Sequence, residues 1–146
     1  MRFKFVWVGK TKNKNWLALQ EDYLQRLSHF VKFDISELRD GTKESEGKLI
    51  IETLNPHSFC CVLDVVGKPF SSHDLSNKIE NWQNQSFKEI SFIIGGADGV
   101  SSQVLEKSDQ RISLSQLTLT HEAARVLLIE QLYRAYTILK GFPYQK

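Results

Sequence analysis

Short stretches rich in apolar residues recur along the chain, and their patterns predict strands. Residues 2–8 alternate between polar and apolar side chains and are rich in Phe, Val and Trp, as is typical of a strand. Residues 59–66, FCCVLDVV, and residues 90–94 are apolar without alternation, which favours strands that are buried on both faces. Two further strands are predicted at residues 33–38 and 111–115.

Between these strands, apolar residues recur at helical spacing or follow a residue that caps helices well. Residues 39–47 are polar and charged, and are predicted as a loop. The predicted helices are residues 15–30 with Asn15 as the cap, residues 48–54, a helix from Ser71 or Ser72 to residue 84, a short helix after Ser101 or Ser102, and residues 121–140 ended by Gly141 and Pro143.

The alternation of strands and helices predicts a fold of the α/β class, with a single domain and a mostly parallel sheet flanked by helices. In such sheets, ligands bind beyond the carboxyl ends of the strands. Three segments are expected at such ends: Gly67-Lys68 after the third strand, the glycine stretch 95–99 after the fourth, and residues 115–120 after the fifth. Each is a candidate part of a ligand site.

The glycine stretch, Gly95-Gly96-Ala97-Asp98-Gly99, is the first candidate for chemistry. Glycine tolerates positive φ and lets another backbone or a ligand approach closely. The pattern is neither GxGxxG nor a Walker loop, no basic residue stands nearby in the sequence, and Asp98 would repel phosphate. A neutral or cationic ligand is therefore favoured over a dinucleotide or triphosphate. A strand-to-helix turn that needs no ligand explains the same residues.

The last predicted helix, HEAARVLLIEQLYRAYTILK, is apolar on nearly every face. Such a helix is buried on most sides, which indicates a partner subunit in a two-fold dimer; the alternative is a helix packed inside its own sheet. Glu130 and Arg134 are spaced to pair. Arg125 needs a structural partner or serves a site. His121 is the only histidine beside a candidate ligand loop, and it acts as an acid or base or bonds to backbone at the helix start.

Composition narrows the class of protein. The chain has 146 residues, of which 41% are hydrophobic and 25% charged, as is ordinary for one soluble domain. The lack of a long apolar run and of a signal peptide predicts a cytoplasmic protein with no membrane span. A net charge of +2 is too mild to argue for nucleic acid by itself. Cys60 and Cys61 are predicted as buried free thiols, and no Cys/His spacing resembles a metal site.

Three blocks of sequence, in this order, resemble one known family. They are IIGGADG, then SLSQLTLTHEAARVLLIEQLYRAYTIL, then GFPYQK at the end; the opening FKFVWVGK and the segment LDVVGKPFSS agree as well. Together they resemble the RlmH family, bacterial ribosomal RNA methyltransferases of the SPOUT superfamily, over the whole length. Any one block alone would be weak, whereas the three at this spacing are specific.

The resemblance implies an enzyme that uses S-adenosylmethionine to methylate N3 of a pseudouridine in 23S rRNA, within the assembled ribosome. It also implies a SPOUT-type C-terminal trefoil knot and a homodimer with the cofactor at its interface. A cofactor with a sulfonium cation and no phosphate agrees with a glycine loop that has no lysine. Carried over position by position, the family's cofactor contacts fall on Leu63, Gly95, Leu114, Ser115, Gln116, Leu117, Thr118 and Leu119.

Methylation at N3 also requires that the N3 proton leave, to a side chain or to water. The candidate catalytic residues are His121, Arg125, Arg134 and Tyr144. Either arginine is alternatively a contact for RNA phosphate or for the deprotonated base.

The tail of the chain departs from the family. It reads Phe142-Pro143-Tyr144-Gln145-Lys146, whereas the family usually has histidines where Phe142 and Gln145 stand. Two other functions therefore stay open: methylation of another RNA, and an RNA- or ribosome-binding module that has lost catalysis.

Overall fold

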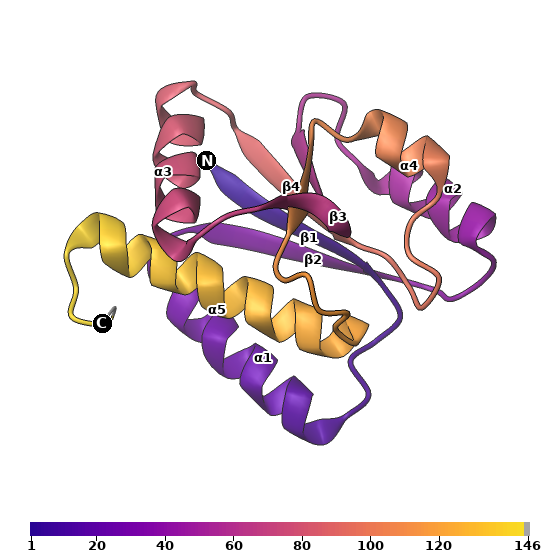
Figure 1. Ribbon diagram of the computed structural model, residues 1–146, viewed down its shortest axis with the longest axis horizontal. Coiled ribbons are helices and arrows are strands. Elements are labelled where there is room, and N and C mark those ends of the chain that lie inside the picture. Colours follow the sequence, from indigo (N-terminus) through magenta and orange to yellow (C-terminus); the bar gives the residue numbers. More distant parts are fainter. Residues whose placement is uncertain (145–146) are drawn as a thin grey trace.

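The computed structural model describes residues 1–144, in which five strands alternate with five helices (Figure 1). Every strand and helix that the sequence predicts is present, with differences at several ends. In chain order the elements are β1 (Arg2–Val8), α1 (Lys14–Leu27), β2 (Lys32–Leu38), α2 (Lys43–Thr53), β3 (Phe59–Pro69), α3 (Ser72–Asn84), β4 (Glu89–Ile94), α4 (Ser102–Lys107), β5 (Gln110–Ser113) and α5 (His121–Lys140).

The five strands form one sheet in the order β2-β1-β4-β3-β5, and every pair of neighbours is parallel. The predicted α/β class is confirmed. Because the strands run the same way, their carboxyl ends lie at one edge of the sheet. The order places β3 between β4 and β5, and its pairing with β4 puts Val62 opposite Ile93, so the middle of β3 reaches that edge beside the ends of β4 and β5.

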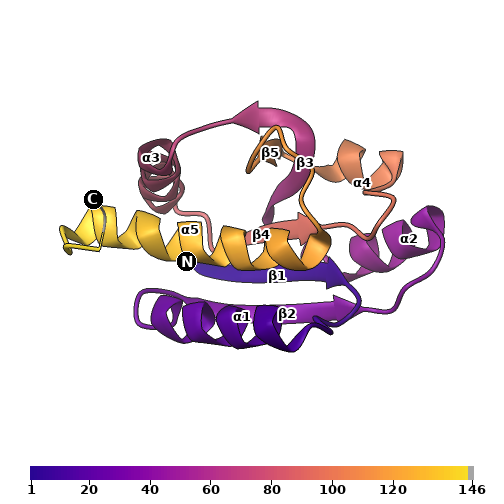
Figure 2. The ribbon, with the colours of Figure 1, turned by 60° about the horizontal axis from the view of Figure 1, so that its bottom comes forward.

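Side chains of β1 alternate between the two faces of the sheet, as the pleat of a strand requires. Phe3 and Trp7 belong to the larger core cluster, which α1, α3 and α5 complete. Val6 belongs to a second cluster on the other face, with Ile50 of α2 and Val104 of α4. Figures 1 and 2 both show α1, α3 and α5 grouped together, apart from α2 and α4.

Helix α5 lies between α1 and α3, and its own chain buries most of its faces (Figure 1). Leu128, Leu132 and Ala135 are fully buried, while Leu127 is 40% exposed. Packing within the chain therefore accounts for most of the apolar surface that the sequence pattern attributes to a partner subunit, and a dimer stays a prediction. None of the helices in residues 1–144 is long and apolar enough to cross a membrane.

Helix α2 begins earlier than the sequence predicts. Residues 39–47 are expected as a loop, but Thr42 caps the helix by accepting a backbone N–H at 3.1 Å, and α2 starts directly after it. Glu46 and Gly47 are buried in this helix. A Cβ on Gly47 would collide with the hydroxyl of Ser101. The glycine that marks a loop in the sequence instead permits close packing of α2 against the start of α4.

Strand β3 continues past Val66, where the sequence predicts its end. Its pairing with β5 shifts between Leu63 and Lys68, so the residues between them bulge from the sheet. A Cβ on Gly67 would lie 2.8 Å from the backbone of Ile112. Gly67 therefore permits two strands to approach closely, and the prediction that it closes the strand is wrong.

Smaller differences concern caps and ends. Asn13, rather than Asn15, caps α1, because its side chain accepts from the backbone N–H groups of Asn15 and Trp16. Helix α1 ends at Leu27, before the predicted residue 30, and β5 spans four residues that begin at Gln110.

Candidate active site

A cavity of about 640 Å³ lies at the carboxyl edge of the sheet. Its walls come from the middle of β3, from the ends of β4 and β5, from the first turn of α5, and from parts of α2 and α4. Such a volume is within the range of sites that enclose a small molecule. Of the three segments predicted at this edge, the two after β4 and β5 line the cavity, and Gly67-Lys68 does not.

Seven of the eight residues predicted to contact a cofactor line this cavity, and they come from three separate parts of the sequence. Gln116 is exposed and lies outside the lining. The seven are Leu63, Gly95, Leu114, Ser115, Leu117, Thr118 and Leu119. The order of the strands brings them together.

The glycine stretch forms a tight turn whose glycines meet protein atoms. Gly99 N donates to Gly96 O at 3.0 Å, and Gly99 has a φ of +79°, which favours glycine. A Cβ on Gly95 would lie 2.6 Å from Gly99 O, and a Cβ on Gly96 would lie 3.0 Å from Glu46 Oε1. The turn therefore needs glycine at 95 and 99 for its own geometry, and these residues line the cavity as well.

Residues 113–120 form another wall, and hydroxyl groups hold its shape. Ser113 Oγ donates to the carbonyl of Ser115 at 2.8 Å, and Ser115 Oγ accepts from Leu117 N at 3.0 Å. Thr120 then caps α5 by accepting a backbone N–H at 3.2 Å. Leu117 lines the cavity and is 74% exposed, so it lies at the mouth.

Two acidic side chains and one basic side chain line the cavity. Asp64 follows Leu63 in β3, and Asp98 lies in the glycine turn. Lys43 comes from the first turn of α2, so the structure places a basic residue at this site although none is near the glycines in the sequence. Two carboxylates and one ammonium give a net negative lining, which attracts a cation more than an anion.

His121, the first residue of α5, lines the cavity. Its neighbour Glu122 is turned toward the β1–α1 loop, where its carboxylate accepts from Lys12 N at 2.9 Å and from Asn13 N at 3.1 Å. The N–H of Lys12, assisted by that of Asn13, holds the pKa of Glu122 below its ordinary value. These two hydrogen bonds fix the first turn of α5 to this loop. The backbone that carries His121 is therefore fixed as well.

Arg125 lies outside the cavity lining and has structural partners. It is fully buried, and its guanidinium donates to Val8 O at 2.6 Å and to Thr11 Oγ1 at 2.8 Å. The same group lies 4.9 Å from the centre of the Trp7 ring. Burial disfavours the charged form and lowers the pKa of Arg125. Of the two roles that the sequence leaves open, the contacts support the structural one.

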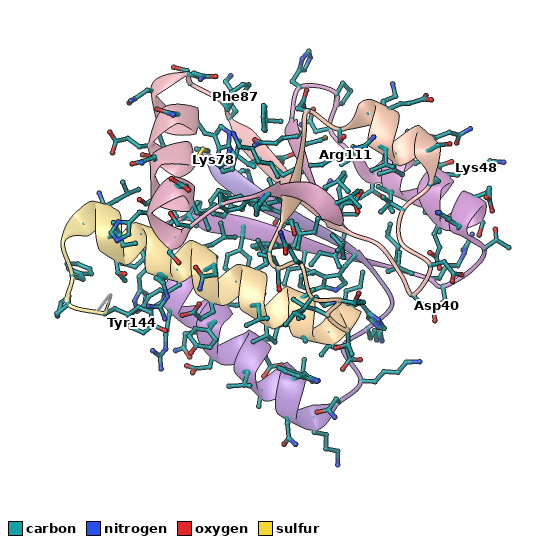
Figure 3. The ribbon with its side chains drawn as sticks, viewed as in Figure 1. Asp40, Lys48, Lys78, Phe87, Arg111 and Tyr144 are labelled. Atoms are coloured by element: carbon teal, nitrogen blue, oxygen red, sulfur yellow. The ribbon has the colours of Figure 1, made fainter. Side chains whose placement is uncertain are left out.

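Arg134 and Tyr144 lie toward the opposite end of α5 from His121. Arg134 pairs with Glu130 at 2.6 Å, and its guanidinium lies 4.7 Å from the centre of the Tyr144 ring. Tyr144 OH donates to Glu130 Oε1 at 2.9 Å, and burial together with hydrogen bonding raises the pKa of Tyr144. Arg134 lies thirteen positions after His121 along α5, or about 20 Å away. Figure 3 likewise shows Tyr144 far from Asp40, which follows β2.

Reasoning from the sequence missed part of the lining. Ile94 and Asp64 carry a usable signal, because each adjoins a predicted contact in the sequence. Lys43 carries none, since only the packing of α2 places it at the cavity. Of the tail positions where the chain departs from the family pattern, Phe142 is 52% exposed and Gln145 lies outside the described residues.

Comparison with known proteins finds similarity along the whole chain. A family model described as "Predicted SPOUT methyltransferase" matches residues 1–145. Curated relatives named ribosomal RNA large subunit methyltransferase H are similar over their full length. The one from Flavobacterium psychrophilum is 41% identical and covers 99% of this chain and 98% of its own. The one from Desulfotalea psychrophila is 37% identical and covers all of both chains.

Solved structures resemble the fold. A probable methyltransferase from Bordetella pertussis Tohama I superposes with a TM-score of 0.61 at 12% identity, covering 92% of this chain and 95% of that one. A probable methylase family protein from Haemophilus influenzae Rd KW20 gives a TM-score of 0.58 at 9% identity, covering 99% and 70%. At such identities the likeness concerns the fold alone.

Proposed function

The chain belongs to the SPOUT methyltransferase family, and from this premise we propose that it methylates large-subunit ribosomal RNA with S-adenosylmethionine as the methyl donor. We place the methyl group on N3 of a pseudouridine, as the resemblance to the RlmH family implies. The curated relatives, which are named for large-subunit rRNA and match this chain from end to end, support the choice of RNA.

The observation that carries the proposal is the convergence of three distant segments on one cavity. Leu63, Leu114 and Leu119 supply apolar surface, and the turn of residues 95–99 supplies backbone N–H and C=O groups for an adenine edge. The net negative lining suits a sulfonium cation. The residues present therefore fit S-adenosylmethionine, which supplies, when bound, a methyl group that is already activated for transfer.

The chain's own contribution is to hold the target base in line and to take its proton. Alignment of reacting groups supplies about 7–11 kcal/mol of a barrier in well-oriented systems. His121 is the proposed base, because among residues 1–144 it is the imidazole that lines the cavity, and imidazole is the side chain that most often serves as a general base. In this proposal the N3 proton passes to a ring nitrogen of His121 as N3 becomes nucleophilic.

We extend the proposal to a homodimer in which a second copy completes the site. Within one chain, Arg134 and Tyr144 lie too far along α5 to meet a base that His121 contacts. The Arg134–Tyr144 pair of a second copy supplies a cation and an aromatic face, which suit a deprotonated or stacked base. The trefoil knot implied by the family belongs to the same proposal.

The test uses large ribosomal subunits from a strain that lacks this gene. We expect calorimetry to detect S-adenosylmethionine binding, and labelled methyl groups to enter 23S rRNA at one pseudouridine in the subunits faster than in naked rRNA. Binding of the cofactor without transfer to any RNA would favour the binding module instead. Transfer to tRNA alone would identify another RNA as the substrate.

A further inference from the structure

We propose that the loop between β1 and α1 is a phosphate-binding surface that holds the rRNA strand beside the nucleotide in the cavity. The proposal rests on the proposed function and adds the route by which the RNA reaches the site. Lys10, Lys12 and Lys14 occupy three of five consecutive positions, with no acidic residue between Gly9 and Glu21.

The three lysines are exposed and available. Among the side chains of residues 1–144, none of the three forms an ion pair. Closely spaced like charges repel one another, and a polyanion such as an RNA backbone relieves that repulsion and releases its own counterions. The overall charge of +2 does not reveal this cluster. Two carboxylates also lie at the loop, Glu122 on its backbone N–H groups and Asp40 beside Gly9, so three lysines face two acidic groups there.

The loop is held rigidly while its lysines face solvent. Thr11, between two of them, is buried: its hydroxyl donates to Gln20 Oε1 at 2.6 Å and accepts from Arg125 at 2.8 Å. The side chain of Asn13 is held by capping α1, and Glu122 accepts two backbone N–H groups of the loop. Alternate residues therefore anchor the loop and present lysines, so little backbone entropy is lost when a strand binds.

The position of the loop relates the lysines to the cavity. His121 and Ala124 line the cavity, whereas Glu122 and Arg125 bond to residues of the loop and β1. The first turn of α5 thus separates the two. A helix is about 10–12 Å across, a distance that a short stretch of RNA strand spans. An RNA strand whose target base enters the cavity therefore passes over α5 and sets the phosphates of nearby nucleotides against the lysines.

A contact between the loops after β1 and β2 connects the lysine loop to the cavity. A Cβ on Gly9 would lie 2.8 Å from Asp40 Oδ1, so the loops that follow β1 and β2 touch. The loop after β2, marked by Asp40 in Figure 3, leads directly into Lys43, which lines the cavity. A lysine after β2 therefore lines the cavity, and the loop that carries Lys10 and Lys12 touches the segment that leads to it.

The experiment compares two double variants of equal charge. Lys10→Ala with Lys12→Ala removes the proposed contacts, and Lys32→Ala with Lys88→Ala removes exposed lysines at the start of β2 and before β4, the opposite edge of the sheet. Binding to large ribosomal subunits is measured by sedimentation between 50 and 200 mM salt, beside steady-state methyl transfer. Thermal unfolding and calorimetry with S-adenosylmethionine verify that fold and cofactor affinity are unchanged.

We expect the Lys10/Lys12 variant to bind subunits more weakly and to raise KM with little change in kcat, while the Lys32/Lys88 variant behaves as wild type. Each lost phosphate contact lowers the salt slope by about 1, so from 50 to 200 mM the wild type loses about sixteenfold more affinity than the variant. Equal behaviour of both variants, in slope and KM, overturns the inference even if the wild type methylates rRNA. If the wild type binds subunits but transfers no methyl group, the proposed function fails, and the salt slopes still decide the inference.

Discussion

A buried guanidinium needs acceptors, and Arg125 finds them in the Val8 carbonyl and the Thr11 hydroxyl while its flat face covers Trp7. Within the described chain its Nε has no partner, so the fork is only partly satisfied. These contacts join α5 to the end of β1 and to the β1–α1 loop. The guanidinium that makes Arg125 a catalytic candidate in the sequence therefore serves to hold α5 against β1 and its loop.

Arg125→Met should therefore destabilise the protein. It leaves a buried carbonyl and hydroxyl without their donor, and hydrogen bonds to charged groups are each worth about 1.5–3 kcal/mol. Urea unfolding should show a loss of about 3 kcal/mol, and Arg125→Lys, which keeps the charge but loses the fork, should lose less. Methyl transfer by the fraction that stays folded should remain near wild type. A stable Met variant with abolished transfer would instead assign Arg125 to catalysis.

His121 is predicted to behave in the opposite way. His121→Asn keeps a polar side chain of similar size at the start of α5 but cannot take a proton at neutral pH. Loss of a general base typically lowers a rate about 10²–10⁴-fold, so kcat should fall by that amount while thermal stability changes little. His73→Asn, at an exposed position of α3, is the matched control and should be indistinguishable from wild type. A kcat within about twofold of wild type for His121→Asn would remove it as the base.

At the scale of elements, the turn after β4 packs against two neighbours that differ in how far they can move: the backbone of Gly99 and the side chain of Glu46. The Cβ of Gly95→Ala would meet the backbone of Gly99 at 2.6 Å, whereas the Cβ of Gly96→Ala would meet the end of the Glu46 side chain at 3.0 Å. Backbone cannot yield without distorting the turn, while the Glu46 carboxylate has to shift by only a few tenths of an ångström against its hydrogen bond from Gly41 N. Gly95→Ala should thus lower the free energy of unfolding by more than about 1–3 kcal/mol, the usual range for overpacking, and Gly96→Ala by less.

Unfolding in urea, with S-adenosylmethionine titrated in parallel, measures both effects. Loss of cofactor affinity in Gly95→Ala should accompany loss of stability, since the same turn forms the cavity wall. Comparable stability of the two alanine variants would contradict this account of the turn.

The elements themselves were largely predictable, and the errors have local causes. The unalternating run that forms β4 is correctly identified as a strand buried on both faces, because a parallel sheet covered by helices excludes water from both. For β3 this prediction is confirmed only over residues 60–62; Val65 and Val66 are exposed, beyond the point where the pairing with β5 shifts. The predicted helix starts later than α2 does, because the polar residues before it and Gly47 are typical of a loop, and only the close approach of Ser101 explains a glycine there. The end of β3 is placed too early for the same reason, since the close neighbour of Gly67, Ile112, is far away in the sequence.

At the scale of the whole molecule, the location of the site followed from strand order, whereas its composition did not. Parallel strands bring the segments after β4 and β5 to one edge, which the sequence indicates. The position of Lys43 and the burial of α5 between α1 and α3 depend on how helices pack over the sheet. The separation of His121 from Arg134 depends only on helix length, and it bears directly on how many chains build one site.

A site shared between two copies makes a distinctive prediction for mixed oligomers. His121→Asn and Arg134→Ala are each expected to be inactive alone. In a heterodimer of the two, one site combines the intact His121 of one chain with the intact Arg134 of the other, and the second site has neither. Random exchange in a two-fold dimer yields about half heterodimers, so mixing should restore about a quarter of the wild-type rate.

The measurement is methyl transfer to large subunits after the variants are unfolded and refolded together, with each variant refolded alone as the control. Because a site contained within one chain cannot be repaired by a partner, a mixture no more active than its two components would overturn the shared site and leave the cavity of the single chain as the whole active site.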